Sequence, residues 1–254
     1  MSEGTVGKAM SVLDLVASKG RPVRLVEVQD EADYPKATLY RLLQSLVKEG
    51  LLTFSPERQT YALGLRLVRL AHSAWSQSSL GPVARPVIEA LAAKVGETVH
   101  LAQLDQGQVL YVDKRNALRP IEMFSQAGKV GPAYCTGVGK AMLAFLGEAE
   151  LDAALKRQAF YQHTRSTLMG TEALRAELAA IRKAGVAYDR EEHEAGIICI
   201  AVPILTGAGR VIGGLSVTSS VQRHSLEALE VFRAPLIDAA AMIARDAEAW
   251  LFPA

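Results

Sequence analysis

The segment 35–50 constrains the fold of this chain most, because it carries a complete helical pattern with a start and a stop. Pro35 stands where the first turn of a helix accepts proline, and Gly50 stands where a helix commonly ends. Between them, apolar residues recur every three or four positions: Leu39, Leu42, Leu43, Leu46 and Val47. The other face is polar and carries Lys36, Tyr40, Gln44 and Lys48, with Ala37 and Arg41 beside them. The pattern predicts an amphipathic helix with one face buried.

Shorter elements are predicted on both sides of this helix. A first helix has one apolar face, formed by Val6, Met10, Leu13 and Ala17, and it ends at the Gly-Arg-Pro of residues 20–22. A second short helix turns Leu25, Val28 and Ala32 inward and stops at residues 33–34. After the polar-faced helix, strands are predicted at 51–54 and 60–63, joined by a turn-rich loop that contains Arg58.

This order of elements is that of a winged helix-turn-helix. A B-DNA major groove about 12 Å wide admits one helix, whose polar residues then reach base edges. Arg58 in the hairpin is placed to touch flanking phosphates. The alternative is a small helical domain whose polar face is merely solvated. With 28 basic and 27 acidic residues the chain has no global field that favours nucleic acid, so DNA binding requires local placement of charge.

Residues 65–79 form a fourth predicted helix with an apolar stripe of Leu67, Leu70, Ala71, Ala74 and Trp75. Such a stripe on a connecting helix must pack somewhere, either on the second domain or on another copy of the chain. Gly81 and Pro82 then mark a domain boundary.

The remainder, residues 80–254, alternates helix and strand patterns. Helices are predicted at 83–95, 139–145, 148–157, 171–184 and 225–249. Strands are predicted at 98–105, 108–115, 119–123, 185–188, 199–205 and 211–219. Because hairpin signals join neighbouring strands, we expect an α+β domain with a largely antiparallel sheet and helices beside it.

Composition excludes several classes of protein. No apolar run approaches the roughly 18 residues that a membrane helix needs, and no secretory signal is visible, so we expect a cytoplasmic protein without membrane contact. Two cysteines are too few for a disulfide framework, and five scattered histidines imply no metal site. The glycine-rich residues 137–140 are no phosphate loop, since Tyr134 and Ala141 replace its first glycine and its hydroxyl residue. We therefore expect no cofactor.

An enzyme is the alternative from a different class. The acidic segment 191–194 contains His193 and lies near Cys199 in sequence, and a thiol of Cys199 or Cys135 is the candidate nucleophile. Because Cys199 lies in an apolar stretch, burial should raise the pKa of its thiol and leave it unreactive.

Small polar residues punctuate the apolar strands in a way that suggests a binding pocket. Ser216 and Thr218 lie two apart, so both hydroxyls point to one face of a strand. Residues 135–137 come just before a helix, whose free N–H groups attract anions. The alternative is that each group is a satisfied core hydroxyl or a helix cap.

Several separated motifs in the right order resemble those of IclR-type transcriptional regulators over nearly the whole chain. They are Tyr-Pro-Lys-Ala-Thr-Leu-Tyr-Arg-Leu-Leu at 34–43, Leu-Gly-Leu-Arg-Leu at 63–67, Cys-Thr-Gly-Val-Gly-Lys-Ala-Met-Leu-Ala at 135–144, Leu-Arg-Ala-Glu-Leu at 174–178 and Asp-Arg-Glu-Glu-His-Glu-Ala-Gly at 189–196.

The resemblance implies three parts: a winged helix-turn-helix at 1–64, a linker helix at 65–79 and a GAF-like effector-binding domain at 80–254. It also implies operator binding as a dimer or a dimer of dimers, under the control of a small molecule. The DNA-contacting residues would be Lys36, Ala37, Thr38, Tyr40, Arg41, Gln44 and Arg58. The effector-binding residues would be Met123, Tyr134, Gly137, Val138, Asp189, Cys199, Ser216 and Thr218.

Four positions depart from the family's pattern. Tyr134 stands where histidine is frequent, and Cys135 stands where alanine is frequent. Ala37 replaces a frequent serine in the polar-faced helix, and Arg24 replaces a capping threonine. These departures concern the identity of the effector and of the operator.

The expected effector is a small organic acid or a compact aromatic acid. Ser216, Thr218 and the amides near Gly137 and Val138 would hold its carboxylate. Asp189 would accept a hydrogen bond from a hydroxyl or amine elsewhere on the ligand. An apolar wall would be formed by Cys199, Val138 and Met123, and Tyr134 would stack on a ring or donate its phenol.

Overall fold

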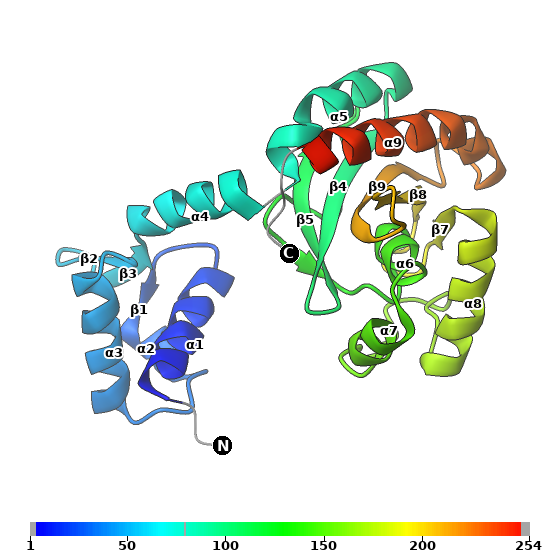
Figure 1. Cartoon of the computed structure of the whole chain (residues 1–254). Helices are drawn as coiled ribbons and strands as arrows, with labels where there is room; N and C mark the ends of the chain where they lie inside the picture. Colours follow the sequence, from blue (N-terminus) through cyan, green and yellow to red (C-terminus); the bar gives the residue numbers. More distant parts are fainter. Residues whose placement is uncertain (1–3, 79, 250–254) are drawn as a thin grey trace. The chain divides into compact units, whose positions relative to one another are not determined.

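The computed structural model describes residues 4–78 and 80–249, and the chain divides into two compact units, Met1–Gln77 and Ser78–Ala254. The first unit begins with α1 (Thr5–Ser18), β1 (Val23–Arg24), α2 (Leu25–Gln29) and α3 (Lys36–Lys48) (Figure 1). It continues with β2 (Leu52–Ser55), β3 (Thr60–Leu63) and all but the last residue of α4 (Leu65–Ser78). Its three strands pair antiparallel in the order β1-β3-β2. The short strand β1 is an element that the sequence pattern did not indicate.

Helix α3 has the boundaries that its start and stop signals require. Pro35 is the N-cap residue, and Gly50 follows the helix with φ +70°, a conformation that glycine adopts without steric cost. The N–H of Gly50 donates to the carbonyl of Val47 over 2.9 Å, and that of Leu51 donates to Leu46 over 2.9 Å, which satisfies the last carbonyls of the helix. Its leucine face is buried in the core of the unit.

The buried face of α1 differs from the predicted one. Among the predicted residues Leu13 is buried, but Val6, Met10 and Ala17 are exposed. Val12 and Val16 are buried instead. Both sets of residues have helical spacing, and only the packing of α1 against α3 selects the second set.

The second unit is an α+β domain built on one six-stranded sheet. Its helices are α5 (Gly81–Val95), α6 (Gly137–Leu143), α7 (Glu148–Leu155), α8 (Thr171–Ala184) and α9 (Arg233–Ala249), with a 3₁₀ helix η1 (Glu227–Phe232). Its strands are β4 (Thr98–Asp105), β5 (Gln108–Arg115), β6 (Val130–Gly131), β7 (Ala187–Arg190), β8 (Ile197–Leu205) and β9 (Val211–Ser220). They pair antiparallel throughout in the order β6-β5-β4-β9-β8-β7, which confirms the predicted fold class.

Two apolar layers enclose this sheet. Helices α5 and α9 lie side by side over one face, where Ile88 and Ile243 pack against strand residues such as Ile200 (Figure 1). Helices α6, α7 and α8 cover the other face, where Met142 and Leu174 are fully buried. The second face carries the polar side chains of the candidate site.

Several predicted elements of this unit are wrong in detail; α6 and β8, for example, each begin two residues before the expected start. Residues 119–123 form no strand, because Pro120 lacks the N–H that a ladder needs, and the chain instead pairs through β6. The single helix expected at 225–249 is split into η1 and α9, since Pro235 in the first turn of α9 cannot continue a helix from before it. Strand β7 begins after the expected start, because Gly185 (φ +73°) caps α8.

Candidate functional site

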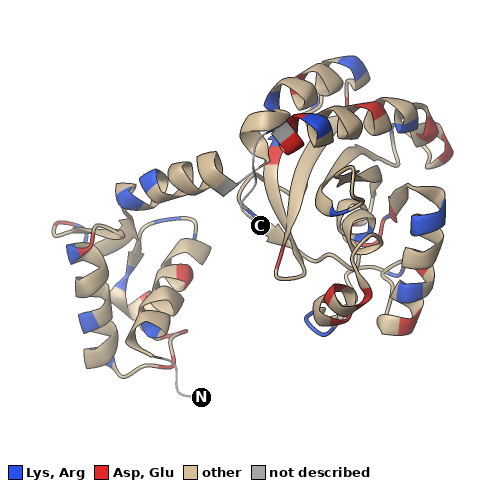
Figure 2. Cartoon of the chain, in the orientation of Figure 1, with Lys and Arg blue, Asp and Glu red and all other residues tan. Residues whose placement is uncertain are grey.

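The exposed face of α3 is the first candidate site. Lys36, Ala37, Tyr40 and Arg41 are exposed, and Thr38 and Gln44 are half-buried. In Figure 2 the Lys and Arg residues of this helix are blue segments spaced along its ribbon. Arg58 is exposed in the turn between β2 and β3. The structure thus places the seven predicted DNA-contacting residues on one helix and the hairpin of the same small unit.

A cleft of about 350 Å³ lies between α2, α3 and the hairpin, and Tyr40, Gln44 and Phe54 contribute to its walls. The side-chain Nε2 of Gln44 in α3 donates to the hydroxyl of Tyr61 in β3 over 3.2 Å, so the hairpin holds the side-chain amide of Gln44. Arg24 stands at the N-cap of α2, where its backbone N–H donates to the carboxylate of Glu27 over 2.8 Å. That contact supports a helix start that lacks the capping threonine.

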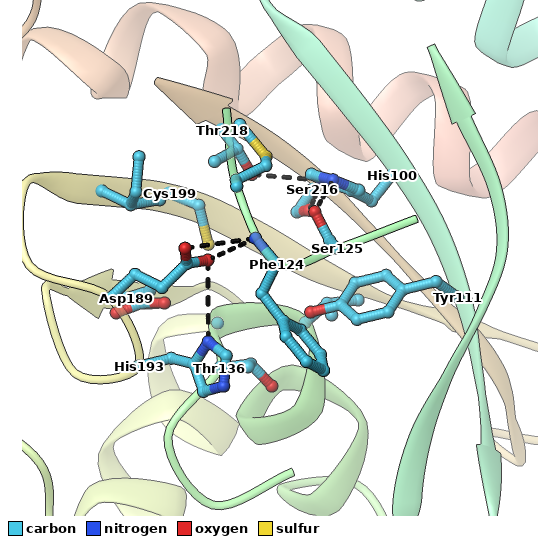
Figure 3. Close-up of a pocket in the computed structure, with 15 residues that line it drawn as sticks. His100, Tyr111, Phe124, Ser125, Thr136, Asp189, His193, Cys199, Ser216 and Thr218 are labelled. Carbon is cyan, nitrogen blue, oxygen red and sulfur yellow. Dashed lines mark hydrogen bonds and ion pairs between the residues drawn. The ribbon is translucent and has the colours of Figure 1, made fainter. Parts of the chain in front are cut away.

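The second candidate site is a cavity of about 30 Å³ on the α6 face of the large sheet (Figure 3). Seven of the eight predicted effector-binding residues line it: Met123, Gly137, Val138, Asp189, Cys199, Ser216 and Thr218. Strand register explains how distant residues meet. Asp189 pairs with Cys199 across β7 and β8, and Cys199 pairs with Thr218 across β8 and β9. Directly opposed residues share a sheet face, so the three side chains form a row.

The first turn of α6 closes on this row because residue 137 is glycine. A Cβ at Gly137 would lie 2.3 Å from Sγ of Cys199 and 3.1 Å from the backbone N of Asp189. Only a residue without a side chain allows the helix to approach the sheet so closely.

Tyr134 does not line the cavity. Its ring is 1% exposed and lies 5.1 Å from that of Phe160, and its hydroxyl donates to the carbonyl of Tyr161 over 2.5 Å. The expected wall residue is therefore packed in the core beside α6, and its phenol is already engaged.

The predicted effector-binding set did not include eight further lining residues of this pocket: His100, Tyr111, Phe124, Ser125, Thr136, His193, Glu194 and Ile197. His100 reaches the site because it lies opposite Ser216 in the pairing of β4 with β9, and no local pattern reveals that register. His193 and Glu194 belong to the acidic segment that the enzyme hypothesis singled out. Phe124 and Ser125 lie on the loop between β5 and β6, for which a strand ending at residue 123 was expected.

The imidazole of His100 contacts three hydroxyl groups of the cavity. Its Nε2 lies 2.7 Å from Oγ of Ser125, and its Nδ1 lies 3.2 Å from Oγ1 of Thr218 and 3.4 Å from Oγ of Ser216 (Figure 3). Burial, together with the nearby ammonium of Lys114, lowers the pKa of His100 to about 3, so the imidazole is neutral at pH 7.

Two carboxyl groups face the cavity from the β7–β8 side. Burial raises the pKa of Asp189 to about 7, although its Oδ1 accepts a hydrogen bond from the N–H of Glu192 over 2.7 Å. Glu194 is partly buried, but hydrogen bonds from His193 and from the N–H of Phe124 outweigh burial and lower its pKa. Its two oxygens lie 2.9 and 3.1 Å from that backbone nitrogen.

Lys140 lies in α6 and is not accessible to a phosphate group from solvent. Its side chain is fully buried, and its Nζ forms ion pairs with Glu192 and, over 3.3 Å, with Glu177. The glycine-rich segment that ends in this lysine is therefore a structural helix start, consistent with the rejection of a phosphate loop.

The thiols are poor nucleophiles. Burial raises the pKa of both Cys135 and Cys199 to about 12, with the carboxyl of Asp189 adding to the effect. Among residues 4–78 and 80–249, no three His, Cys, Asp or Glu side chains gather closely enough to hold a metal ion. None of the helices in these ranges is long and apolar enough to cross a membrane.

The chain combines a winged helix-turn-helix unit with an α+β unit that contains a polar cavity. This combination is typical of transcriptional regulators that bind a small molecule, and comparison with known proteins places the chain in such a family. The family described as IclR helix-turn-helix domain matches residues 5–56, and that described as Bacterial transcriptional regulator IclR C-terminal matches residues 72–245. The chain belongs to the IclR family of DNA-binding transcriptional regulators, whose C-terminal domain binds effectors.

Individual relatives cover nearly the whole chain. The HTH-type transcriptional regulators XynR and KdgR of Escherichia coli K12 are each 32% identical to it, over 95% of this chain and 96% and 92% of their own lengths. The crystal structure of the Thermotoga maritima IclR is 29% identical and has a TM-score of 0.75, covering 95% of this chain and 97% of its own. An IclR homologue from Microbacterium hydrocarbonoxydans, complexed with 4-hydroxybenzoate, is 25% identical with a TM-score of 0.82, covering 97% of this chain and all of its own.

Proposed function

We propose that this chain binds a palindromic operator as a homodimer. A small organic or aromatic acid binds in the cavity lined by His100, Ser216 and Thr218 and changes operator affinity or promoter activity. The observation that carries the proposal is the pair of adjacent hydroxyls, Ser216 and Thr218, on a buried sheet face beside a neutral imidazole. The same chain carries an exposed polar helix of the type that enters a DNA groove.

On the DNA side, α3 is the recognition helix. Arg41 is exposed and Gln44 is half-buried on its polar side, and these side chains have the donors that read guanine and adenine edges in the major groove. Lys36 and Arg58 serve as phosphate contacts, which position the domain without reading sequence. Ala37 offers no hydroxyl, so a contact made by serine at this position would be replaced by an apolar one.

The exposed apolar side chains of α4 support a dimer. In the predicted stripe, Leu70 is 52% exposed and Ala74 is exposed, whereas Leu67 is half-buried against the core of the first unit. In this proposal the chain has a DNA-binding part at 1–64, a linker helix at 65–79 and an effector-binding part at 80–254. Burying the linker helices of two copies against each other gives two-fold symmetry, and a palindromic operator follows from that symmetry. A further pairing of dimers would give a tetramer.

On the effector side, Ser216 and Thr218 hold a carboxylate. Asp189 binds a hydroxyl or amine at the other end of the ligand, and Val138, Cys199 and Met123 supply apolar contact. The homologue complexed with 4-hydroxybenzoate supports an acid of this size and shape. A cavity of about 30 Å³ holds about one water, so the Met123–Phe124 part of the loop must move outward when the acid binds.

DNase footprinting upstream of the chain's own gene tests the proposal. We expect a protected palindrome whose occupancy falls steeply with salt, because phosphate contacts release counterions. Candidate acids should shift that occupancy. Absence of any protected palindrome at modest salt, with and without acids, would reject it. Native mass spectrometry of the purified protein identifies a retained effector. Whether the protein represses or activates depends on the position of the operator relative to the promoter, and we place its action in the cytoplasm, where the DNA lies.

A further inference from the structure

His100 joins three hydroxyl groups of the cavity and is itself unassigned by the proposed function. It lies on β4 and is 2% exposed. Ser125 from the β5–β6 loop contacts its Nε2, and Ser216 and Thr218 from β9 contact its Nδ1 (Figure 3). A neutral imidazole has one N–H donor and one acceptor nitrogen, so its tautomer sets the direction of every hydrogen bond in this cluster.

The two tautomers give the pocket opposite chemistry. If Nδ1 carries the hydrogen, it donates to the hydroxyl oxygens of Ser216 and Thr218, and both hydroxyl hydrogens are then available to a ligand. If Nε2 carries the hydrogen, the single lone pair of Nδ1 accepts from the hydroxyl of Ser216 or Thr218, and that hydroxyl presents its own lone pairs to the ligand. The first arrangement suits a carboxylate, and the second suits an ammonium group or a neutral donor.

The distances favour the first arrangement. The contact between Ser125 Oγ and Nε2 is 2.7 Å, which lies at the short end of the range for bonds donated by N–H and well within the range for bonds donated by a hydroxyl. The two contacts at Nδ1 are longer, 3.2 and 3.4 Å, as expected when one N–H is shared between two acceptors.

Ser125 is anchored for this role. It is 6% exposed, and its carbonyl accepts a hydrogen bond from Nζ of Lys114 over 2.7 Å. Phe124 beside it is 36% exposed and is held by other contacts, since its N–H donates to the carboxylate of Glu194.

We propose that His100, held in its Nδ1–H tautomer by the hydroxyl of Ser125, is the residue that makes the pocket selective for carboxylates, because it turns Ser216 and Thr218 into hydrogen-bond donors. This inference rests on the proposed function for the identity of the pocket. It adds a positioning role for His100 and Ser125.

The first test needs no ligand. In protein labelled with ¹⁵N-histidine, long-range ¹H–¹⁵N correlation spectra distinguish the two tautomers of a neutral imidazole, and the spectrum of His100→Gln identifies the signals of residue 100. We expect the Nδ1–H form in the wild type. The Nε2–H form would overturn the inference.

The second test compares two probes of equal shape, 4-hydroxybenzoate and 4-hydroxybenzamide, by calorimetry. The wild type should prefer the acid by about tenfold or more, since a hydrogen bond to a charged group contributes about 1.5–3 kcal/mol. Ser125→Ala should reduce that ratio to about threefold or less, because the tautomer is no longer fixed. The matched control is Ser219→Ala, which removes a buried serine bonded to another imidazole, Nδ1 of His224, over 3.0 Å. It should leave the ratio unchanged.

Failure of the inference and failure of the proposed function give different results. If Ser125→Ala keeps the wild-type ratio and the wild-type tautomer, His100 does not set the specificity. If neither probe binds, these compounds are not effectors, and the spectra of the wild type and Ser125→Ala still decide the tautomer claim. Ser125→Ala should then show a mixture of tautomers, and an unchanged Nδ1–H spectrum would count against Ser125.

Discussion

The side-chain amide of Gln44 in α3 donates a hydrogen bond to the hydroxyl of Tyr61 in β3 over 3.2 Å. The contact joins α3, the proposed recognition helix, to the hairpin inside the first unit. Because Tyr61 is 2% exposed, it holds the Gln44 amide in place before any base is met. A side chain that is already ordered loses less conformational entropy on binding.

Tyr61→Phe should therefore reduce discrimination between operator sequences more than it reduces the free energy of unfolding. We expect the unfolding free energy to fall by about 1 kcal/mol, the usual value of one hydrogen bond. Discrimination at one base pair of each half-site should fall, and Gln44→Ala should abolish it at a cost of about 1–3 kcal/mol. Competition binding with single-base operator variants measures this. Equal losses for all operator variants would show that Gln44 reads no base.

Arg58→Ala should weaken binding to every DNA sequence alike. Arg58 is exposed in the β2–β3 turn, and in our proposal it contacts a phosphate. Loss of one phosphate contact should reduce the slope of log affinity against log salt by about one per protomer. Anisotropy titrations of specific and random duplexes across a salt series check this. A loss confined to the specific duplex would instead place Arg58 on a base edge.

Gly137→Ala should destabilise the second unit, because its Cβ would lie 2.3 Å from Sγ of Cys199. Overpacking of a buried site costs about 1–3 kcal/mol. The double variant Gly137→Ala with Cys199→Ala removes the sulfur and should recover part of that loss. Urea unfolding of both single variants and the double variant measures the coupling, and strictly additive losses would exclude the close approach of α6 to β8 as the cause.

Asp189 should make the fold less stable as pH rises from about 4 to about 7. Its pKa is raised to about 7 by burial, with Glu192 raising it further and Lys140 and His193 lowering it. Over this range the unfolded state releases the proton and the folded state keeps it, so the stability contributed at low pH is lost at up to about 1.4 kcal/mol per pH unit. The difference in unfolding free energy between wild type and Asp189→Asn should follow this slope. A difference that stays constant from pH 4 to 7 would place the pKa of Asp189 at its ordinary value.

Most of the fold was predictable from the sequence because most helices and strands have clear start and stop signals and a regular apolar pattern. Pro35, Gly50 and the leucines between them define α3, and Thr98–Asp105 and Gln108–Arg115 emerge as strands with the predicted bounds. The predictions were wrong where two sequence patterns fit equally well and only tertiary contacts decide between them. The face of α1 is one case, and the loop that delivers Phe124 and Ser125 to the cavity is another.

The candidate pocket was predictable only in part. Ser216 and Thr218 share a strand, so their common direction follows from spacing alone. His100 lies more than 100 positions away and meets them only through the pairing of β4 with β9. Tyr134 was expected in the wall from a resemblance. It instead packs on Phe160 with its hydroxyl bonded to the backbone, an arrangement that no spacing rule encodes.

The central claim is that an acid binds between Ser216 and Thr218 and thereby controls operator affinity. The most direct measurement is calorimetric titration of the acid that alters operator occupancy, on wild type and on the double variant Ser216→Ala with Thr218→Val. Loss of two charge-assisted hydrogen bonds should cost at least about 2 kcal/mol, so the dissociation constant should rise more than tenfold. An unchanged dissociation constant in a folded double variant would remove both residues from the effector site and contradict the account.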